Sequence, residues 1–178
     1  MPKLIKFEIK RLPKLCVVGK QLRYSWEALE SGDNRRPGFW DKCYEENIFA
    51  SLEAQIEYIF DSSHVGVYLD WHLDDKDFTY IVGMLMKPGV TIPEGYVARE
   101  IAEVDVAVGW IKGKFASRGV DRDGPDSENG YDLMVKSIKE NDRDNSNMKW
   151  CMEPYNCPRF TEPDENGDTI VDNYIPLN

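Results

Sequence analysis

WCMEPY at residues 150–155 and TIVDNYIPL at residues 169–177 are two apolar runs near the end of the chain. Between them, ENGD at residues 165–168 has the acidic, glycine-containing composition of a turn. Two strand-like runs around such a segment predict a β-hairpin. The first run carries one carboxylate, Glu153, among aromatic and sulfur-containing neighbours.

Glu153 is the carboxylate of the first run and does not suit burial. Side chains two positions apart share a face of a strand, so Cys151, Glu153 and Tyr155 are expected to point one way and Met152 the other. A carboxylate on a face suited to burial costs free energy unless its charge is compensated. A hydrogen-bonding tyrosine, a bound proton or a cationic ligand could compensate it. We therefore expect Glu153 to lie in a ligand pocket.

The composition favours a globular, acidic protein. The 178 residues include 42% hydrophobic side chains, enough for one substantial domain or two small ones that share a core. Acidic residues outnumber basic ones by 32 to 22, which gives a net charge of −10. This balance argues against nucleic-acid and anionic-membrane partners and mildly favours cationic small molecules.

Targeting, metal and cofactor signals are weak in this sequence. The N-terminal residues alternate charged and apolar side chains, and no run approaches the roughly 20 apolar residues of a membrane span. The four cysteines form no CxxC pair and have no histidine at ligand spacing. No phosphate-binding loop, dinucleotide fingerprint or nucleophile elbow is present. We expect a cytoplasmic protein that binds neither a metal nor a cofactor.

Hydrophobic periodicity predicts two successive strand-helix-strand-strand units. The first contains strands at 3–10 and 14–23, a helix at 39–60, and strands at 65–72 and 78–86 around an acidic turn at 74–77. The second contains strands at 96–101 and 104–111, a glycine- and aspartate-rich mobile loop at 116–129, a helix at 132–139 and the closing hairpin.

The two units look like copies of one another. LPKLCVVG at 12–19 and IAEVDVAVG at 101–109 both lead from an apolar residue into a valine-rich run that ends in glycine. We interpret this as a duplication within a single domain, with repeat one at about 3–87 and repeat two at about 94–177. The predicted class is α+β: a mostly antiparallel sheet with helices on one face and a central cleft between the halves.

Several segments in order carry a resemblance to a known family. They are residues 7–10 through 18–19, 78–84, 92–96, 106–110, and 152–155 with 174–176. Together they resemble the GyrI-like (gyrase-inhibitor-like) family, the effector-binding domain of multidrug-responsive transcription activators that include AraC-type regulators. The resemblance covers about residues 3–177. The chain shows no helix-turn-helix segment, so a standalone form is expected.

The resemblance implies a cleft for amphipathic, often cationic molecules. The family has an acidic residue two positions before a tyrosine in the penultimate strand, and Glu153 before Tyr155 matches it. Some standalone members are held to be hydrolases of strained, cyclopropane-bearing toxins that use a pocket glutamate.

Six residues are the candidate ligand-binding set. Glu153 is the expected electrostatic anchor, and each aromatic candidate could equally serve the core. The aromatic candidates are Trp110, Trp71, Tyr155, Tyr174 and Tyr68. Tyr68 and Trp71 differ by an odd number of positions, so on a regular strand only one of them could face the cleft. His64 and His72 are expected at the surface.

Three functions remain open. The first is capture of hydrophobic, often cationic, drug-like or toxin-like compounds without turnover. The second is a hydrolase in which Glu153 is the general base and Tyr155 or Tyr68 assists the proton transfer. The third is a protein-interaction module of the gyrase-inhibitor type, whose acidic surface would mimic a nucleic acid. The acidic residues are dispersed along the chain, which ranks the third function last and leaves a protein partner open.

Overall fold

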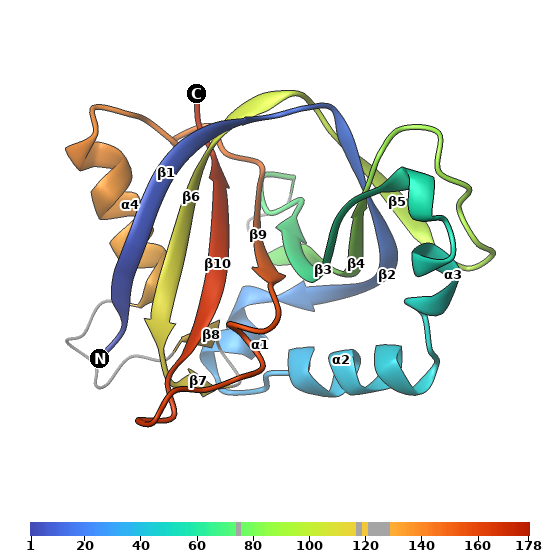
Figure 1. Ribbon diagram of the computed structural model, residues 1–178, viewed down its shortest axis with the longest axis horizontal. Coiled ribbons are helices and arrows are strands. Elements are labelled where there is room, and N and C mark those ends of the chain that lie inside the picture. Colours follow the sequence, from blue (N-terminus) through green and yellow to red (C-terminus); the bar gives the residue numbers. More distant parts are fainter. Residues whose placement is uncertain (74–75, 117–118, 121–128) are drawn as a thin grey trace. The chain divides into compact units, whose positions relative to one another are not determined.

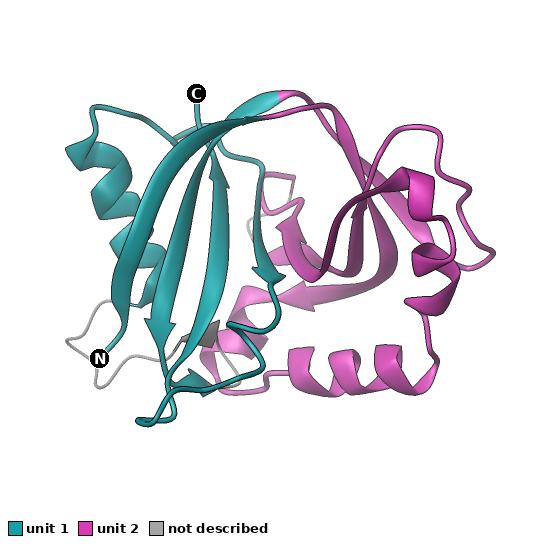
Figure 2. Cartoon of the chain, viewed as in Figure 1, with its two compact units in different colours: residues 1–11, 104–178 teal, residues 12–103 magenta. Residues whose placement is uncertain are grey.

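The computed structural model describes residues 1–73, 76–116, 119–120 and 129–178. These divide into two compact units, shown in different colours in Figure 2. Unit 1 comprises residues 1–11 and 104–178, and unit 2 comprises residues 12–103. Most of the predicted loop at 116–129 and the first half of the turn at 74–77 lie outside the described residues.

Unit 2 contains a sheet of four strands in the order β3-β4-β2-β5 (Figure 1). The strands are β2 (Leu15–Ser25), β3 (Ile59–Leu69), β4 (Asp77–Met86) and β5 (Val97–Ile101). All three neighbouring pairs are antiparallel. Nine consecutive residues of β4, from Phe78 to Met86, are buried, as expected of a central strand covered on both faces.

The helix predicted at 39–60 is wrong in its extent. The segment forms α2 (Arg36–Glu45), α3 (Ala50–Glu53) and the 3-10 helix η1 (Ile56–Tyr58), and Ile59 already begins β3. The break follows from Asn47, which has φ 51°, because asparagine tolerates this left-handed conformation better than most residues. The apolar positions still reach one core after the break, since Cys43 and Leu52 are both buried there.

A short helix, α1 (Trp26–Glu30), was not predicted. It follows β2 directly, and the Ser25 side chain caps it by accepting a hydrogen bond from the Ala28 backbone N–H at 3.0 Å. Five residues are too few to show a helical period, so a serine before the helix was the available signal.

Unit 1 also contains four strands, in the order β1-β6-β10-β9. They are β1 (Lys3–Leu12, in this unit up to Arg11), β6 (Val104–Gly113), β9 (Trp150–Tyr155) and β10 (Thr169–Pro176). β10 pairs antiparallel with both β6 and β9, which confirms the predicted hairpin. A small pair, β7 (Phe115–Ala116) with β8 (Gly119–Val120), was not predicted.

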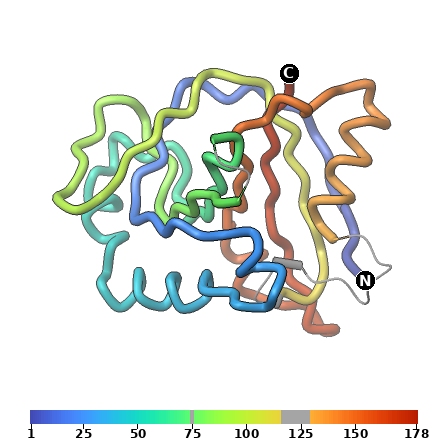
Figure 3. The backbone as a smooth tube through the Cα atoms, turned by 180° about the vertical axis from the view of Figure 1, so that it is seen from behind, coloured from blue at the N-terminus to red at the C-terminus, as the bar shows by residue number. Residues whose placement is uncertain are grey.

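The helix α4 (Gly130–Glu140) confirms the prediction for 132–139 and packs on one face of this sheet, the far face in Figure 1 and the near face in Figure 3. A capping box between Asn129 and Asp132 begins it. Met134 and Ile138 are fully buried against β6 and β10. A Cβ at Gly109 would lie 2.0 Å from the Met134 Sδ, so glycine is what lets α4 approach β6.

Each unit thus contains a strand-helix-strand-strand run. Its last strand, β4 in unit 2 and β10 in unit 1, has a hydrogen-bonded strand on each side. The α+β class is confirmed. The repeat boundaries, about 3–87 and 94–177, stay a prediction. Within the described part of the chain, no helix combines the length and apolar character needed to cross a membrane.

Candidate functional site

Glu153 and Tyr155 lie together on β9. The Tyr155 hydroxyl donates a hydrogen bond to Glu153 Oε2 at 3.0 Å, and both residues are half-buried. Met152, which precedes Glu153 in the strand, is fully buried and pairs with Tyr174 of β10. The predicted alternation of faces is confirmed, and a tyrosine is one of the compensating groups expected for this carboxylate.

The strand register places Glu153 on the face that α4 covers. Because Met152 pairs with Tyr174 in an antiparallel ladder, Glu153 continues that register opposite Asn173, which pairs with Gly109 of β6. Paired residues share a face, and Gly109 lies under Met134 of α4. Cys151 and Tyr155 accordingly pack against the core cluster that contains Met134.

The charge of Glu153 acts on the neighbouring thiol. Burial and, as a smaller cause, the charge of the nearby Glu153 carboxylate together raise the pKa of the Cys151 thiol to about 12. Burial also raises the pKa of Tyr131 on α4, with a contribution from Cys151. The Tyr131 hydroxyl lies 3.8 Å from the Met148 Sδ. The carboxylate therefore has soft, polarisable sulfur and aromatic groups in its neighbourhood.

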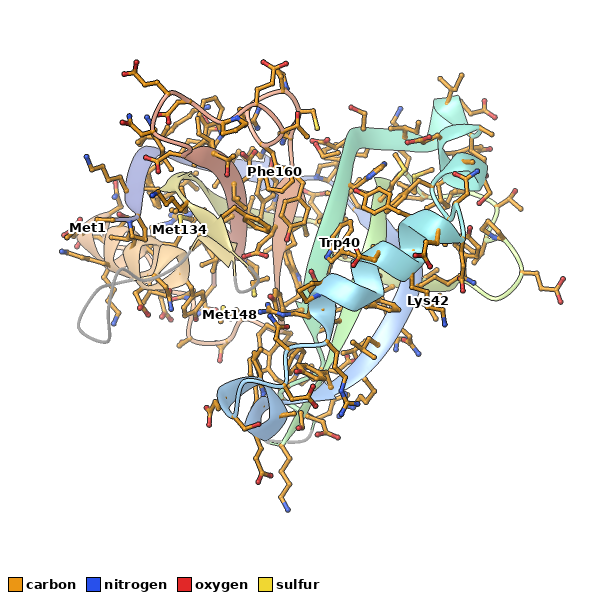
Figure 4. The ribbon with its side chains drawn as sticks, turned by 90° about the horizontal axis from the view of Figure 1, so that it is seen from below. Met1, Trp40, Lys42, Met134, Met148 and Phe160 are labelled. Atoms are coloured by element: carbon orange, nitrogen blue, oxygen red, sulfur yellow. The ribbon has the colours of Figure 1, made fainter. Side chains whose placement is uncertain are left out.

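Two phenylalanines that sequence reasoning missed complete this neighbourhood. The Tyr155 ring lies 4.7 Å from the Phe160 ring and 6.0 Å from the Phe115 ring, and the two phenylalanine rings are 5.0 Å apart. Phe160 lies in the connection after β9 (Figure 4), and Phe115 begins β7. Neither belongs to a long periodic segment, so the sequence gives no signal except their aromatic character.

The other predicted residues of unit 1, Trp110 and Tyr174, lie on the opposite face of the sheet. Trp110 pairs with Asp172, and Tyr174 pairs with Met152, so both share the face of Met152 and not that of Glu153. Lys6 Nζ and the Arg159 guanidinium each lie 4.5 Å from the Trp110 ring centre. Two of the protein's own cations therefore already contact this indole.

Tyr174 is also in contact with a cation of the chain. Lys10 Nζ lies 4.5 Å from its ring centre and donates a hydrogen bond to its hydroxyl at 2.8 Å. Tyr174 is 4% exposed. The structure thus brings Glu153 and Tyr155 together and does not bring Trp110 or Tyr174 to them.

Arg159, which is partly exposed, forms an ion pair with the buried Asp172 beside Trp110. Asp172 is 1% exposed and accepts hydrogen bonds from Arg159 Nε at 3.0 Å and from Arg159 Nη2 at 2.5 Å. Asn156 Nδ2 donates to the same carboxylate at 2.9 Å. These bonds attach the connection after β9, which carries Phe160, to β10.

Tyr68 and Trp71 belong to unit 2 and contact one core cluster there. The alternation of faces on a regular strand does not extend to Trp71, because β3 ends at Leu69 and Asp70 has φ 65°. The Tyr68 ring lies 4.9 Å from the Tyr80 ring.

Arg36, at the start of α2, is a buried charge beside these tyrosines. Its Nη1 donates to the Tyr68 hydroxyl, and its Nε donates to Asn34 Oδ1 at 3.0 Å. Its guanidinium lies 5.5 Å from the Tyr68 ring centre and 6.0 Å from that of Tyr80. Arg36 is 8% exposed, and no pattern in the sequence predicts a buried arginine at this position.

The histidines differ in environment. His72 is exposed in the turn after β3, as expected. His64 is half-buried on β3 and hydrogen-bonds to Tyr44 and Glu53. All four cysteines are free. Among the described residues, no three or more His, Cys, Asp or Glu side chains are grouped in a way that could hold a metal ion.

Comparison with solved structures gives matches over nearly the whole chain. SAV2435 bound to tetraphenylphosphonium matches with a TM-score of 0.62 and 14% identity, over 98% of this chain and 94% of that one. A putative transcription regulation protein from Staphylococcus aureus MU50 matches with a TM-score of 0.59 and 16% identity, over 97% and 98%. The C-terminal domain of EcmrR matches with a TM-score of 0.53 and 10% identity, over 97% of each chain.

The chain has the fold of these proteins. It is the fold that the resemblance to the GyrI-like effector-binding family implies, so that part of the resemblance is confirmed. No protein-family model matches the sequence, and no curated protein matches it either. At these identities the structural likeness establishes the fold, and the ligand has to be argued from the residues.

Proposed function

We propose that this protein binds hydrophobic organic cations and that Glu153 is the anionic anchor of the site. The observation that carries the proposal is the Glu153–Tyr155 pair: a half-buried carboxylate held by a tyrosine hydroxyl at 3.0 Å, with aromatic rings beside it. A phenolic hydrogen bond orients an ionised carboxylate without removing its charge.

The surroundings of Glu153 favour a bulky apolar cation over a small hydrated one. Tyr155, Phe160 and Phe115 present aromatic rings, whose faces attract cations by roughly 0.5–2 kcal/mol each. Met148 and Tyr131 add polarisable groups near Cys151. One charge and adaptable apolar walls suit broad recognition of aromatic cations.

The strength of the attraction between the Glu153 carboxylate and a cation determines how much affinity is lost when the carboxylate is removed. A contact between unit charges contributes about 1 kcal/mol in water and about 4 kcal/mol at an effective dielectric of 20. Glu153 is half-buried, and the charge of a phosphonium is shielded by its substituents. We therefore expect loss of the carboxylate to weaken binding by about 10- to 100-fold, since about 1.4 kcal/mol corresponds to a factor of ten.

The comparison with known structures agrees with this choice of ligand. SAV2435, which shares the fold, was solved with tetraphenylphosphonium, a lipophilic cation with four aromatic rings. The net charge of −10 adds a long-range attraction for any cation.

A titration with tetraphenylphosphonium, followed by tryptophan fluorescence, tests the proposal. Wild-type protein should bind, and Glu153→Gln should bind about 10- to 100-fold more weakly. Glu162→Gln is the matched control, because it removes the same net charge from an exposed position and should bind like the wild type. Equal affinity of the Glu153→Gln and wild-type proteins would remove Glu153 from the site.

Hydrolysis of strained electrophiles is the second candidate. The same 3.0 Å contact favours it, because it places a hydroxyl that could assist proton transfer beside the carboxylate that would take a proton from water. After incubation with a cyclopropane-bearing electrophile, mass spectrometry would find a product heavier by one water if Glu153 activates water. Glu153→Gln and Tyr155→Phe should both lose that product. An unchanged compound that remains bound supports capture alone.

Four aromatic residues remain predicted wall residues: Trp110, Tyr174, Tyr68 and Trp71. A direct nucleic-acid partner is not expected, and a protein partner remains open. In the fluorescence titration, Trp71→Phe and Trp110→Phe should each alter the quenching only if their indole contacts the ligand.

A further inference from the structure

Three side chains of unit 2 form a continuous hydrogen-bonded row. The Tyr44 hydroxyl of α2 lies 3.1 Å from His64 Nδ1 on β3, and His64 Nε2 lies 3.1 Å from Glu53 Oε1 of α3. The row therefore runs from a hydroxyl through an imidazole to a carboxylate. The three residues come from three separate elements, so sequence reasoning found no such constellation.

The carboxylate determines which imidazole nitrogen carries the proton. An ionised carboxylate can only accept hydrogen bonds, so the neutral ring must present its N–H at Nε2 to Glu53. Nδ1 then has only its lone pair, and the contact with Tyr44 requires the phenol to donate its proton. His64 is thereby placed as a base toward Tyr44 Oη.

Ring packing holds the imidazole in this orientation. His64 stacks on Phe49 with ring centres 3.6 Å apart and planes 6° from parallel. The Tyr44 ring packs against the same phenylalanine at 5.2 Å. The row lies at the surface, because Tyr44 is 54% exposed and the His64 side chain is 23% exposed. A small molecule can therefore reach Oη while the base stays fixed.

We propose that this row makes Tyr44 Oη a nucleophile toward small activated acyl donors, such as aryl esters. Oη attacks the carbonyl carbon, and the bond from that carbon to the aryloxide oxygen breaks. The phenolic proton moves to His64 Nδ1, and the resulting imidazolium is stabilised by Glu53. The departing aryloxide takes this proton from Nδ1, which leaves an O-acyl tyrosine and a free phenol. Tyr44 and His64 are the catalytic residues, and Glu53 is a positioning residue.

This activity is independent of the cation site proposed for Glu153. It uses other residues of another compact unit. Protein lacking the Glu153 carboxylate should therefore react at Tyr44 as the wild type does.

Acetylation by p-nitrophenyl acetate tests the proposal. Release of nitrophenol is followed by absorbance, and the acetylated residue is located by peptide mass spectrometry. We expect Tyr44 to acquire one acetyl group first, well ahead of Tyr131, which is 38% exposed but donates toward a methionine sulfur. The first acetylation should appear as a burst of about one nitrophenol per protein. Tyr44→Phe should abolish this burst, and His64→Gln should slow it by about 100-fold, the usual scale of general-base assistance.

The role of Glu53 has its own readout. Glu53→Gln should slow acetylation of Tyr44, because an amide can offer either its oxygen or its N–H to Nε2 and no longer fixes the tautomer. Glu53→Asp retains a carboxylate and should keep more of the rate than Glu53→Gln. A purely structural role of Glu53 predicts no such order between the two variants.

Two results would overturn the proposal. One is acetylation of Tyr44 at the rate of Tyr131, unaffected by His64→Gln. The other is a burst that persists in Tyr44→Phe with the label on His64, which would make the imidazole itself the nucleophile. Circular dichroism and thermal unfolding of each variant show whether the fold is intact, and Tyr131 acetylation in the same sample provides an internal reference.

Discussion

At the scale of single residues, Cys151 reports on the charge of Glu153. The pKa of this thiol is raised to about 12, first by burial and then by the carboxylate on the same face of β9. Thiolate is the reactive form, and at pH 9 only about one Cys151 side chain in a thousand should be a thiolate. The rate of its alkylation should therefore increase with pH until about pH 12.

Alkylation with iodoacetamide followed by peptide mapping measures this directly. The exposed Cys157 should be labelled far ahead of Cys151 at pH 8. Glu153→Gln should lower the pKa of Cys151 and speed its alkylation, whereas Glu162→Gln should not. Equal labelling of Cys151 and Cys157 in the wild type would show that the thiol is not enclosed as described.

Glycine is required at two corresponding positions for different packing reasons. Gly19 and Gly109 end the two valine-rich runs that suggested a duplication. A Cβ at Gly19 would lie 2.0 Å from the Val82 carbonyl oxygen of a neighbouring strand. One at Gly109 would instead meet a helix side chain, Met134. The sequence pattern predicts that both positions need glycine, but only the packing shows which neighbour requires it.

At the scale of elements, the packing of α4 on β6 depends on Gly109. Gly109→Ala should destabilise the protein by roughly 1–3 kcal/mol, because its Cβ would lie 2.0 Å from the Met134 Sδ and 2.8 Å from the Leu4 Cδ1. Gly38→Ala is the matched control. Its Cβ meets nothing within 4 Å and lies inside α2, so it should be neutral or stabilise by up to about 1 kcal/mol. Urea unfolding measures both, and equal effects would contradict the account.

The connection after β9 depends on the Arg159–Asp172 pair. Asp172→Asn removes the buried carboxylate that pairs with the partly exposed Arg159 guanidinium, and should reduce the free energy of unfolding by roughly 3 kcal/mol. Glu100→Gln is the control, because its pair with Lys14 is exposed on both sides and should contribute less than about 1 kcal/mol. A loss of similar size in both variants would show that burial of Asp172 does not matter.

Most strands and α4 lie close to their predicted bounds. The exception among the strands is β3, which spans Ile59–Leu69 where a strand at 65–72 was predicted. The predicted helix at 39–60 is not continuous, because the backbone turns at Asn47. The apolar residues spaced three and four apart nevertheless pack into one core on both sides of this turn. Helical spacing therefore indicated which residues are buried, but not that one helix carries them.

At the scale of the whole molecule, the sequence predicted the α+β class and part of the site. Glu153 and Tyr155 were placed together by two-residue spacing, which is a local property of a strand. Trp110 and Tyr174 were grouped with them because they are aromatic, yet the register of β10 puts them on the other face. Register depends on pairing between distant segments, so composition alone could not supply it.

The central claim is that the charge of Glu153 selects cations, and a thermodynamic cycle by isothermal titration calorimetry tests it most directly. The affinities of tetraphenylphosphonium and of the neutral triphenylphosphine oxide are measured in wild-type protein and in Glu153→Gln. The wild type should prefer the cation by about tenfold or more, and Glu153→Gln should lose most of this preference. A preference for the cation that is the same in both proteins would contradict it.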